Sequence, residues 1–179
     1  MRKVVAGLFI SLDGVVESPD QWSFDHFDEG MMIEMQSQLD AQDTVLLGRV
    51  TYQEWASYWP TSEDEPFASY INNIPKYVIS STLKSADWNN TTLINGNLTE
   101  EINKLKQQSG KHVGVAGSPT LVRSLLQHGL LDQLSLTIHP VIAGTGQRLF
   151  QDFDGIKRLK LVDSKTTETG VLIATYQPR

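Results

Sequence analysis

The sequence predicts a three-layer α/β domain, with a mostly parallel central sheet, helices on both faces and an antiparallel hairpin near its C-terminal end. Short apolar runs alternate with helical patterns along residues 1–130, which is typical of parallel strands joined by crossover helices. The last third changes to alternating strands separated by glycine-rich turns. Because the chain has 179 residues, 40% of them hydrophobic, and no linker-like stretch, we expect a single domain over residues 1–179.

The first strand and helix follow from apolar patterning. Val4–Ile10 is a short apolar run, as expected of a strand buried on both faces, and Ser11–Gly14 ends it in a turn. Val15–Val16 resumes in extended form before a polar loop. Phe27–Leu39 has helical spacing, and its predicted core-facing residues are Met31, Met32, Met35 and Leu39.

The middle of the chain repeats the order of strand and helix. Strands are predicted at Val45–Leu47, Tyr77–Ser81, Thr92–Ile94 and Val113–Ala116. Helices are predicted at Thr51–Tyr58, Phe67–Asn72, Glu100–Ser109 and from Pro119 onward, the last with the apolar face Leu121, Leu125 and Leu126. Thr99 is the expected N-cap of the third helix, because two glutamates follow it in the first turn.

The last third predicts antiparallel structure. Gln133–Val141 alternates in hydrophobicity, and Ala143–Gly146 forms a turn. Arg158–Ser164 and Gly170–Tyr176 are expected to pair as a terminal hairpin. The hairpin should therefore lie at one edge of the sheet.

Composition excludes several classes of function. Fifteen basic and 21 acidic residues give a net charge of −6, which argues against nucleic acid as a partner. Residues 1–90 hold 5 basic and 14 acidic residues, so an anionic ligand would have to be bound by local groups. The absence of cysteine excludes disulfides, a thiol nucleophile and Cys-ligated metals. No metal site is expected, because no metal spacing links His26, His112, His128 and His139.

The N-terminus predicts a strand and not a signal peptide. The apolar run after Lys3 is short and lacks a cleavage-site pattern. No stretch approaches the roughly 20 apolar residues of a membrane span. We therefore expect a cytoplasmic protein with no membrane partner.

The ends of three predicted strands carry groups suited to phosphate. After the first of these strands, Gly48 lets the backbone turn sharply, and the helix that follows presents free N–H groups together with Arg49 and Thr51. Ser80, Ser81 and Thr82 end the second strand with hydroxyls. Gly117-Ser118-Pro119-Thr120 ends the third and begins a helix.

These three ends are expected to meet at one edge. In an open α/β sheet, ligands lie beyond the C-terminal ends of the strands. Taken singly, two of the three ends have a plain alternative: Gly48 as a simple turn beside a solvated Arg49, and Ser80-Ser81 as an ordinary strand end. Together they match a diphosphate with a further phosphate beside it.

The ordered motifs of the chain resemble those of a known family. They are Ser11-Leu12-Asp13-Gly14, Leu47-Gly48-Arg49-Val50-Thr51-Tyr52, Tyr77-Val78-Ile79-Ser80-Ser81-Thr82-Leu83, Gly117-Ser118 with Leu121, and Leu131-Asp132-Gln133-Leu134 through Pro140-Val141-Ile142-Ala143-Gly144-Thr145-Gly146-Gln147-Arg148-Leu149-Phe150. The set is similar to the dihydrofolate-reductase-like family, and more closely to its branch that resembles the C-terminal reductase domain of bacterial riboflavin biosynthesis. The resemblance covers nearly the whole chain.

The resemblance implies a dihydrofolate-reductase-like fold that binds NADPH and transfers hydride. Matched by position, the cofactor-binding residues it implies are Gly48, Arg49, Thr51, Ser80, Ser81, Thr82, Gly117, Ser118, Thr120 and Leu121. Arg49 falls on the 2′-phosphate side of the cofactor. The family usually has a Gly-Gly pair at the helix start after the third strand end, and here Ala116-Gly117 replaces it.

On the substrate side, the resemblance points to Ser11 and Asp13, which match a Ser-x-Asp-Gly-Lys element of the riboflavin branch. Val15 stands where the family has the lysine. Asp13 is the candidate catalytic carboxylate near the nicotinamide, and capping of a tight Asp-Gly turn is its equally weighted alternative. Folate reductases carry a carboxylate near the first helix, but none of Asp25, Asp28 and Glu29 aligns cleanly, and a solvated acidic helix start is preferred for them.

Three functions are weighed on this basis. The first is an NADPH-dependent reductase resembling 5-amino-6-(5-phosphoribosylamino)uracil reductase of riboflavin biosynthesis. Since that pathway's bifunctional enzymes need a zinc site with cysteine ligands for deamination, this chain would supply the reductase activity alone. The alternatives are a dihydrofolate reductase and a non-catalytic nucleotide- or flavin-binding dimer. The resemblance also implies a homodimer acting on a small molecule.

Overall fold

The structure is a computed structural model that describes residues 1–179 as one eight-stranded sheet with helices on both faces. The strand order is β4-β3-β2-β5-β1-β6-β8-β7. The strands are β1 (Val4–Ser11), β2 (Gln42–Gly48), β3 (Lys76–Ile79), β4 (Thr91–Ile94), β5 (His112–Gly117), β6 (Gln133–His139), β7 (Leu159–Thr166) and β8 (Leu172–Pro178). The helices are α1 (Glu29–Asp40), α2 (Arg49–Tyr58), α3 (Phe67–Asn73), α4 (Leu98–Gln107) and α5 (Pro119–Gln127), with short 3₁₀ turns η1 (Pro19–Gln21), η2 (Phe24–His26) and η3 (Trp59–Thr61).

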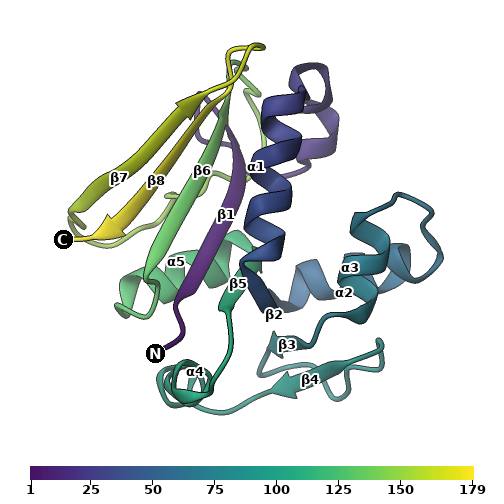
Figure 1. Cartoon of the computed structure of the whole chain (residues 1–179). Helices are drawn as coiled ribbons and strands as arrows, with labels where there is room; N and C mark the ends of the chain where they lie inside the picture. The colour runs from purple at the N-terminus through teal and green to yellow at the C-terminus, as the bar shows by residue number, and fades with distance from the viewer.

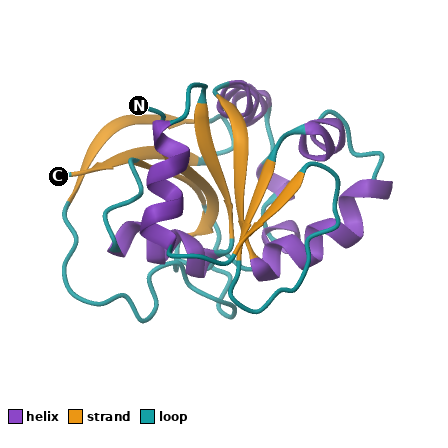
Figure 2. Ribbon diagram, turned by 90° about the horizontal axis from the view of Figure 1, so that it is seen from below, coloured by secondary structure: helices purple, strands orange, loops and turns teal.

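The predicted mixed sheet is confirmed. Strands β1 to β6 pair in parallel, whereas β8 pairs antiparallel with both β6 and β7. Consecutive parallel strands are joined by helices, except β3 and β4, which a loop connects, and the helices cover the sheet from both sides (Figures 1 and 2). The terminal hairpin forms the edge opposite to β4 (Figure 1).

The two larger of three hydrophobic clusters lie on opposite faces of β2. Leu46 of β2 points toward the core under α4 and α5, whereas its neighbours Val45 and Leu47 point toward the core under α2 and α3. This opposition follows from the period of two along a strand. Burial on both faces explains why the centre of β2, Val45–Leu47, is continuously apolar.

Sequence patterning was less accurate for α1. Met31 is buried as predicted, packed against Val171 and Ile173, but Met32 and Ile33 are each 63% exposed. Below the helix, Gln38 reaches toward Ser135 on β6 at 3.5 Å, so part of this interface is polar. Met32 is therefore a surface residue and not part of the predicted core face.

The start of α4 also differs from the prediction. Its N-cap is Asn97, whose side chain accepts a hydrogen bond from the Glu100 N–H at 3.2 Å, and Thr99 lies inside the first turn. Asn and Thr are both good caps, so residue preference alone misplaced the start of α4. Finally, no helix of the structure combines the length and apolarity needed to cross a membrane.

Candidate functional site

The three strand ends singled out in the sequence lie side by side. In the sheet, β2 lies between β3 and β5. Gly48 is paired with Ile79, so the Ser80 turn follows directly beside it, and Leu47 is paired with Gly117. The expectation that these ends share one edge is therefore met by the strand order.

Gly48 and Gly117 bring the β2 and β5 ends into unusually close contact. A Cβ on Gly48 would lie 2.5 Å from Ser118 Oγ and 2.9 Å from Ser118 N. A Cβ on Gly117 would lie 2.8 Å from Thr51 Oγ1, and its φ of +135° also favours glycine. The peptide bond between Gly117 and Ser118 is cis. Both glycines are thus required by a reciprocal approach of the two turns, while Ala116 lies within β5.

The start of α2 is open to a ligand. Its N-cap is Gly48, which offers no side chain to bond the free N–H groups of the first turn, and that turn contains no acidic residue. Arg49 is exposed and donates to Gln53 Oε1 at 2.9 Å, a partner on the same helix. An uncapped ten-residue helix with an exposed arginine fits an anion such as a phosphate.

At the ends of β5 and β3, polar side chains form hydrogen bonds within their own helix or turn. Ser118 caps α5 by accepting from the Leu121 N–H at 3.4 Å, and Pro119 has no N–H to offer. Thr120 accepts from Arg123 at 3.2 Å. Ser80 is buried, and its hydroxyl accepts from the backbone N–H groups of Thr82 and Leu83, so it shapes the turn. Ser81 and Thr82 are exposed beside it.

Asp13 is held in a network that joins the ends of β1 and β6. Its carboxylate accepts from Ser11 Oγ at 2.6 Å and from the N–H groups of Ala143 and Gly144 at 3.0 and 2.9 Å. Arg148 contacts it at 3.3 Å. The Ser11 hydroxyl, followed by the Ala143 N–H, lowers the pKa of Asp13 to about 2. These contacts favour the turn-fixing alternative for Asp13, because a carboxylate ionised at neutral pH has no proton to donate.

Of the acidic residues near the start of α1, Asp28 has a structural role. Asp28 is the N-cap, accepting from the Met31 N–H at 2.9 Å, and it also accepts from Thr169 N–H and hydroxyl groups. Hydrogen bonds from Met31 and then Thr169 hold the pKa of Asp28 well below its usual range. Val15, which replaces the expected lysine, is buried and bridges to Arg148. No cation occupies that position.

Sequence reasoning missed His139. It is the last residue of β6, paired with Ser11 of β1, and it is fully buried. Neither ring nitrogen has a hydrogen-bond partner, and the Nδ1 of neighbouring His26 is also buried and unpaired. The available signal was its place: a polar residue that closes an apolar strand at the same edge as Ser11.

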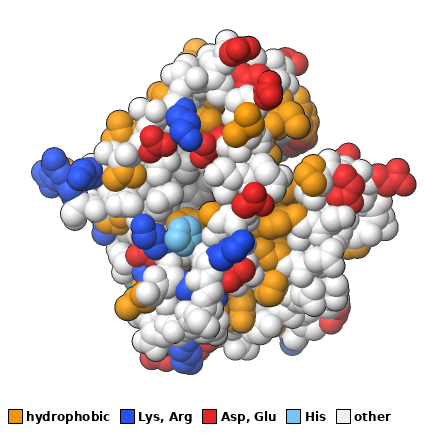
Figure 3. Space-filling view, in the orientation of Figure 1, with side chains coloured by type: hydrophobic (Ala, Val, Ile, Leu, Met, Phe, Trp, Pro, Cys, Tyr) orange, Lys and Arg blue, Asp and Glu red, His pale blue; other side chains and the backbone are white.

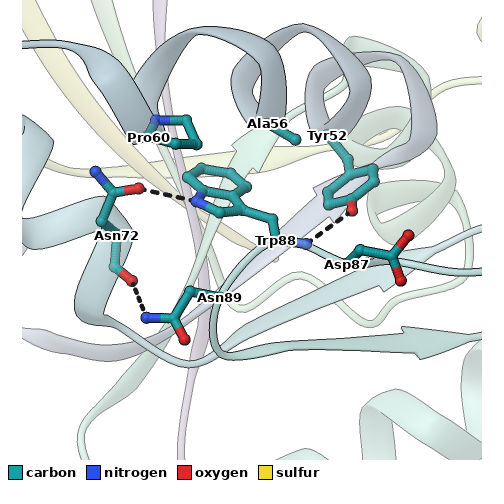
Figure 4. Close-up of a pocket in the computed structure, with 7 residues that line it drawn as sticks. All are labelled: Tyr52, Ala56, Pro60, Asn72, Asp87, Trp88 and Asn89. Atoms are coloured by element: carbon teal, nitrogen blue, oxygen red, sulfur yellow. Dashed lines mark hydrogen bonds between the residues drawn. The ribbon is translucent and has the colours of Figure 1, made fainter.

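A separate pocket lies between α2, η3, α3 and the loop before β4. It has a volume of about 640 Å³ and is lined by Tyr52, Ala56, Pro60, Asn72, Asp87, Trp88 and Asn89 (Figure 4). Trp88 donates its ring N–H to Asn72 at 2.8 Å and its backbone N–H to the Tyr52 hydroxyl at 3.3 Å. Hydrogen bonds join the lining residues Tyr52, Asn72, Trp88 and Asn89 to one another. None of the residues that line this pocket is a predicted site residue.

Under Trp88 lies a buried lysine. Lys76 is fully buried, its ammonium group 4.6 Å from the centre of the Trp88 ring, and it donates to the carbonyls of Ile71 and Ile74 at 2.7 and 2.9 Å. Burial lowers the pKa of Lys76 to about 8. It closes the C-terminal end of α3 and serves the fold at this position.

Known proteins share this architecture. The putative riboflavin biosynthesis protein of Shewanella sp. PV-4 superposes with a TM-score of 0.78 at 18% identity, covering 99% of each chain. Dihydrofolate reductase of Enterococcus faecalis, in complex with NADP(H), superposes with a TM-score of 0.66 at 15% identity, covering 99% of this chain and 96% of that one. The predicted dihydrofolate-reductase-like fold is confirmed.

Sequence comparison gives the family. The uncharacterized protein YyaP of Bacillus subtilis (strain 168) is 33% identical over 182 aligned positions, which cover 98% of this chain and 94% of YyaP. Residues 2–173 match the family described as the RibD C-terminal domain. The chain therefore belongs to the RibD C-terminal domain family.

Proposed function

We propose that this protein is an NADPH-dependent reductase that transfers hydride to a small substrate, as 5-amino-6-(5-phosphoribosylamino)uracil reductase does. The observation that carries the proposal is the meeting of three strand ends around an uncapped α2, where Gly48 and Gly117 keep the backbone bare. Membership of a reductase family supports it.

The chain's own residues bind and orient in this proposal. The free N–H groups at the start of α2 and the Thr51 side chain would hold phosphate oxygens, and Arg49 would bind the 2′-phosphate from the surface. Ser81 and Thr82 would lie beside the adenosine half. NADPH supplies the hydride when it is bound. The Asp13–Arg148 network would keep the β1 and β6 turns in place at the substrate side.

A local anion site suits the surface charge. On the face shown in Figure 3, Lys and Arg side chains lie among Asp and Glu side chains without a broad basic area. The net charge is −6. Recognition of a phosphorylated cofactor would therefore depend on short-range contacts and not on a general positive field.

NADPH oxidation measured separately with the phosphoribosylamino-uracil substrate and with dihydrofolate tests the proposal. We expect turnover with the first substrate and a higher melting temperature in the presence of NADPH, because a ligand that binds only the folded state stabilises it. Turnover with dihydrofolate alone would favour the alternative reductase. Binding of NADPH or flavin without turnover would favour the non-catalytic dimer, and no effect of NADPH in either assay would end the reductase proposal.

We further propose that two copies associate through the terminal hairpin. Strand β7 is an edge strand with one side unpaired, and the hairpin exposes Leu161, Val162 and Leu172 by 50%, 43% and 39%. An exposed edge with apolar side chains is suited to pairing with another chain.

A further inference from the structure

A cluster of aromatic rings surrounds His139, at the shared end of β1 and β6. Its imidazole is fully buried, with both ring nitrogens unpaired. Nearly all buried polar groups in proteins have a hydrogen-bond partner, so an imidazole ring with two unpaired nitrogens requires an explanation. A neutral imidazole presents one donor and one acceptor, and here both are free.

The ring is neutral because of its surroundings. Burial, and then the neighbouring His26, lower the pKa of His139 to about 4. Its neighbours are rings: Phe9 at 5.3 Å, Trp22 at 5.5 Å and His26 at 5.9 Å between centroids, all at steep angles. None of these three gives His139 a hydrogen bond, so the packing is apolar while the group within it is polar.

The cover over His139 belongs to the segment between β1 and α1, near the upper ends of β1 and β6 in Figure 1. Trp22 lies between the two 3₁₀ turns η1 and η2, and its ring N–H donates to Glu17 O within the same segment. The segment is bonded to the rest of the fold at its two ends: Glu17 Oε2 accepts from the Gln147 N–H at 2.7 Å, and His26 O and Asp28 accept from Thr169. Trp22 lies between these ends, and its ring packs against His139 with its own N–H bonded only within the segment.

The neighbouring charges are already paired. Asp13 is bonded to Ser11, to two backbone N–H groups and to Arg148, and Val15 replaces the lysine expected nearby. A substrate ring in this place would meet aromatic walls together with the donor and the acceptor of His139.

We propose that His139 is a specificity-determining residue whose neutral ring accepts a hydrogen bond from an N–H of an uncharged flat heterocycle, with the substrate ring taking the place of Trp22. The inference rests on the proposed function, since this end of β1 lies beside β5, whose end belongs to the cofactor cradle. It concerns the heterocyclic ring of the substrate, which would lie among Phe9, His26 and His139.

Two matched ligands test the assignment. Lumazine is a flat ring with two N–H groups beside carbonyls, and its dimethyl derivative has both N–H groups methylated. We expect the protein to bind lumazine at least about tenfold more tightly, because loss of one partner leaves a buried group of His139 unpaired. Isothermal titration with each ligand measures the ratio. Equal binding of the two ligands, or binding of neither, would overturn the assignment.

Variants of His139 test whether this residue causes the preference for lumazine over its dimethyl derivative. His139→Phe should bind both ligands equally, His139→Gln should keep a preference because it retains a donor and an acceptor, and the exposed control His128→Phe should match the wild type. A preference that survives in His139→Phe would contradict the assignment. If that variant does not fold, the ¹⁵N signals of the wild-type His139 ring decide: a shift on addition of lumazine supports a direct contact, and unchanged signals refute it.

The same samples separate this inference from the proposed function. The NADPH-induced change in melting temperature is measured alongside. NADPH binding without a lumazine preference would overturn the role of His139 alone, whereas loss of NADPH binding would count against the reductase itself.

Discussion

Arg49 makes the cofactor proposal testable at a single side chain. Its guanidinium is exposed and bonded only to Gln53, so truncation should leave the fold intact. Arg49→Ala is expected to weaken NADPH binding by roughly 1.5–3 kcal/mol through loss of a charge-assisted contact, and NADH binding much less. Titration with both nucleotides measures this difference.

The control for Arg49 is Lys160→Ala, an exposed cation on β7 at the far edge of the sheet. It should bind NADPH as the wild type does. Equal losses of NADPH and NADH affinity in Arg49→Ala would show that Arg49 does not contact the 2′-phosphate.

Asp13 predicts an acid-sensitive contribution to stability. Its pKa is lowered to about 2 in the folded protein from a usual value of 3.8, so its contribution is complete above about pH 4 and is lost as the pH falls toward 2. Asp13→Asn should therefore be less stable than the wild type at pH 6, with the difference shrinking at pH 3. Urea unfolding at the two pH values measures it, and a difference independent of pH would contradict the ionised network.

At the scale of the element, the start of α4 depends on one side chain. Asn97→Ala should lower the free energy of unfolding by about 1 kcal/mol, because the first turn loses its cap. Thr99→Ala is the matched control, since Thr99 lies within the helix and makes no cap bond. Chemical denaturation of both variants measures the two free energies of unfolding. A larger loss of stability in Thr99→Ala would instead support Thr99 as the cap, as predicted from the sequence.

Elements with a clear hydrophobic periodicity were predicted well from the sequence. Features that depend on contacts between residues far apart in the sequence were not. The buried runs of β1 and β2 and the apolar face of α5 follow from spacing alone. Local patterning could not show that α1 would pack on a partly polar surface through Gln38, which leaves Met32 exposed.

The candidate site also contains residues that the sequence could predict and residues that it could not. Gly48 and Gly117 stood out because glycine at a strand end has a local meaning. His139 has none: its burial and its unpaired nitrogens arise from Phe9, Trp22 and His26, which come from distant parts of the sequence. In the sequence, His139 is marked only by its place at the close of an apolar strand, which shows neither its burial nor its unpaired nitrogens.

For the whole molecule, the prediction concerns assembly. A double substitution, Leu161→Lys with Val162→Lys, should convert a dimer to monomers, because it places charges on the proposed hairpin interface. Sedimentation velocity measures the change. Ile33→Lys, at an exposed apolar position on α1, is the control and should leave the dimer intact. A monomeric wild type, or a dimer that survives the double substitution, would contradict the proposed interface.

The reciprocal approach of Gly48 and Ser118 has an evolutionary consequence. Because a Cβ at position 48 would collide with the backbone nitrogen of Ser118, no smaller side chain at position 118 could make room for it. At position 117, the positive φ excludes a side chain whatever stands at Thr51. Relatives that keep this spacing between the two helix starts should therefore keep glycine at both positions.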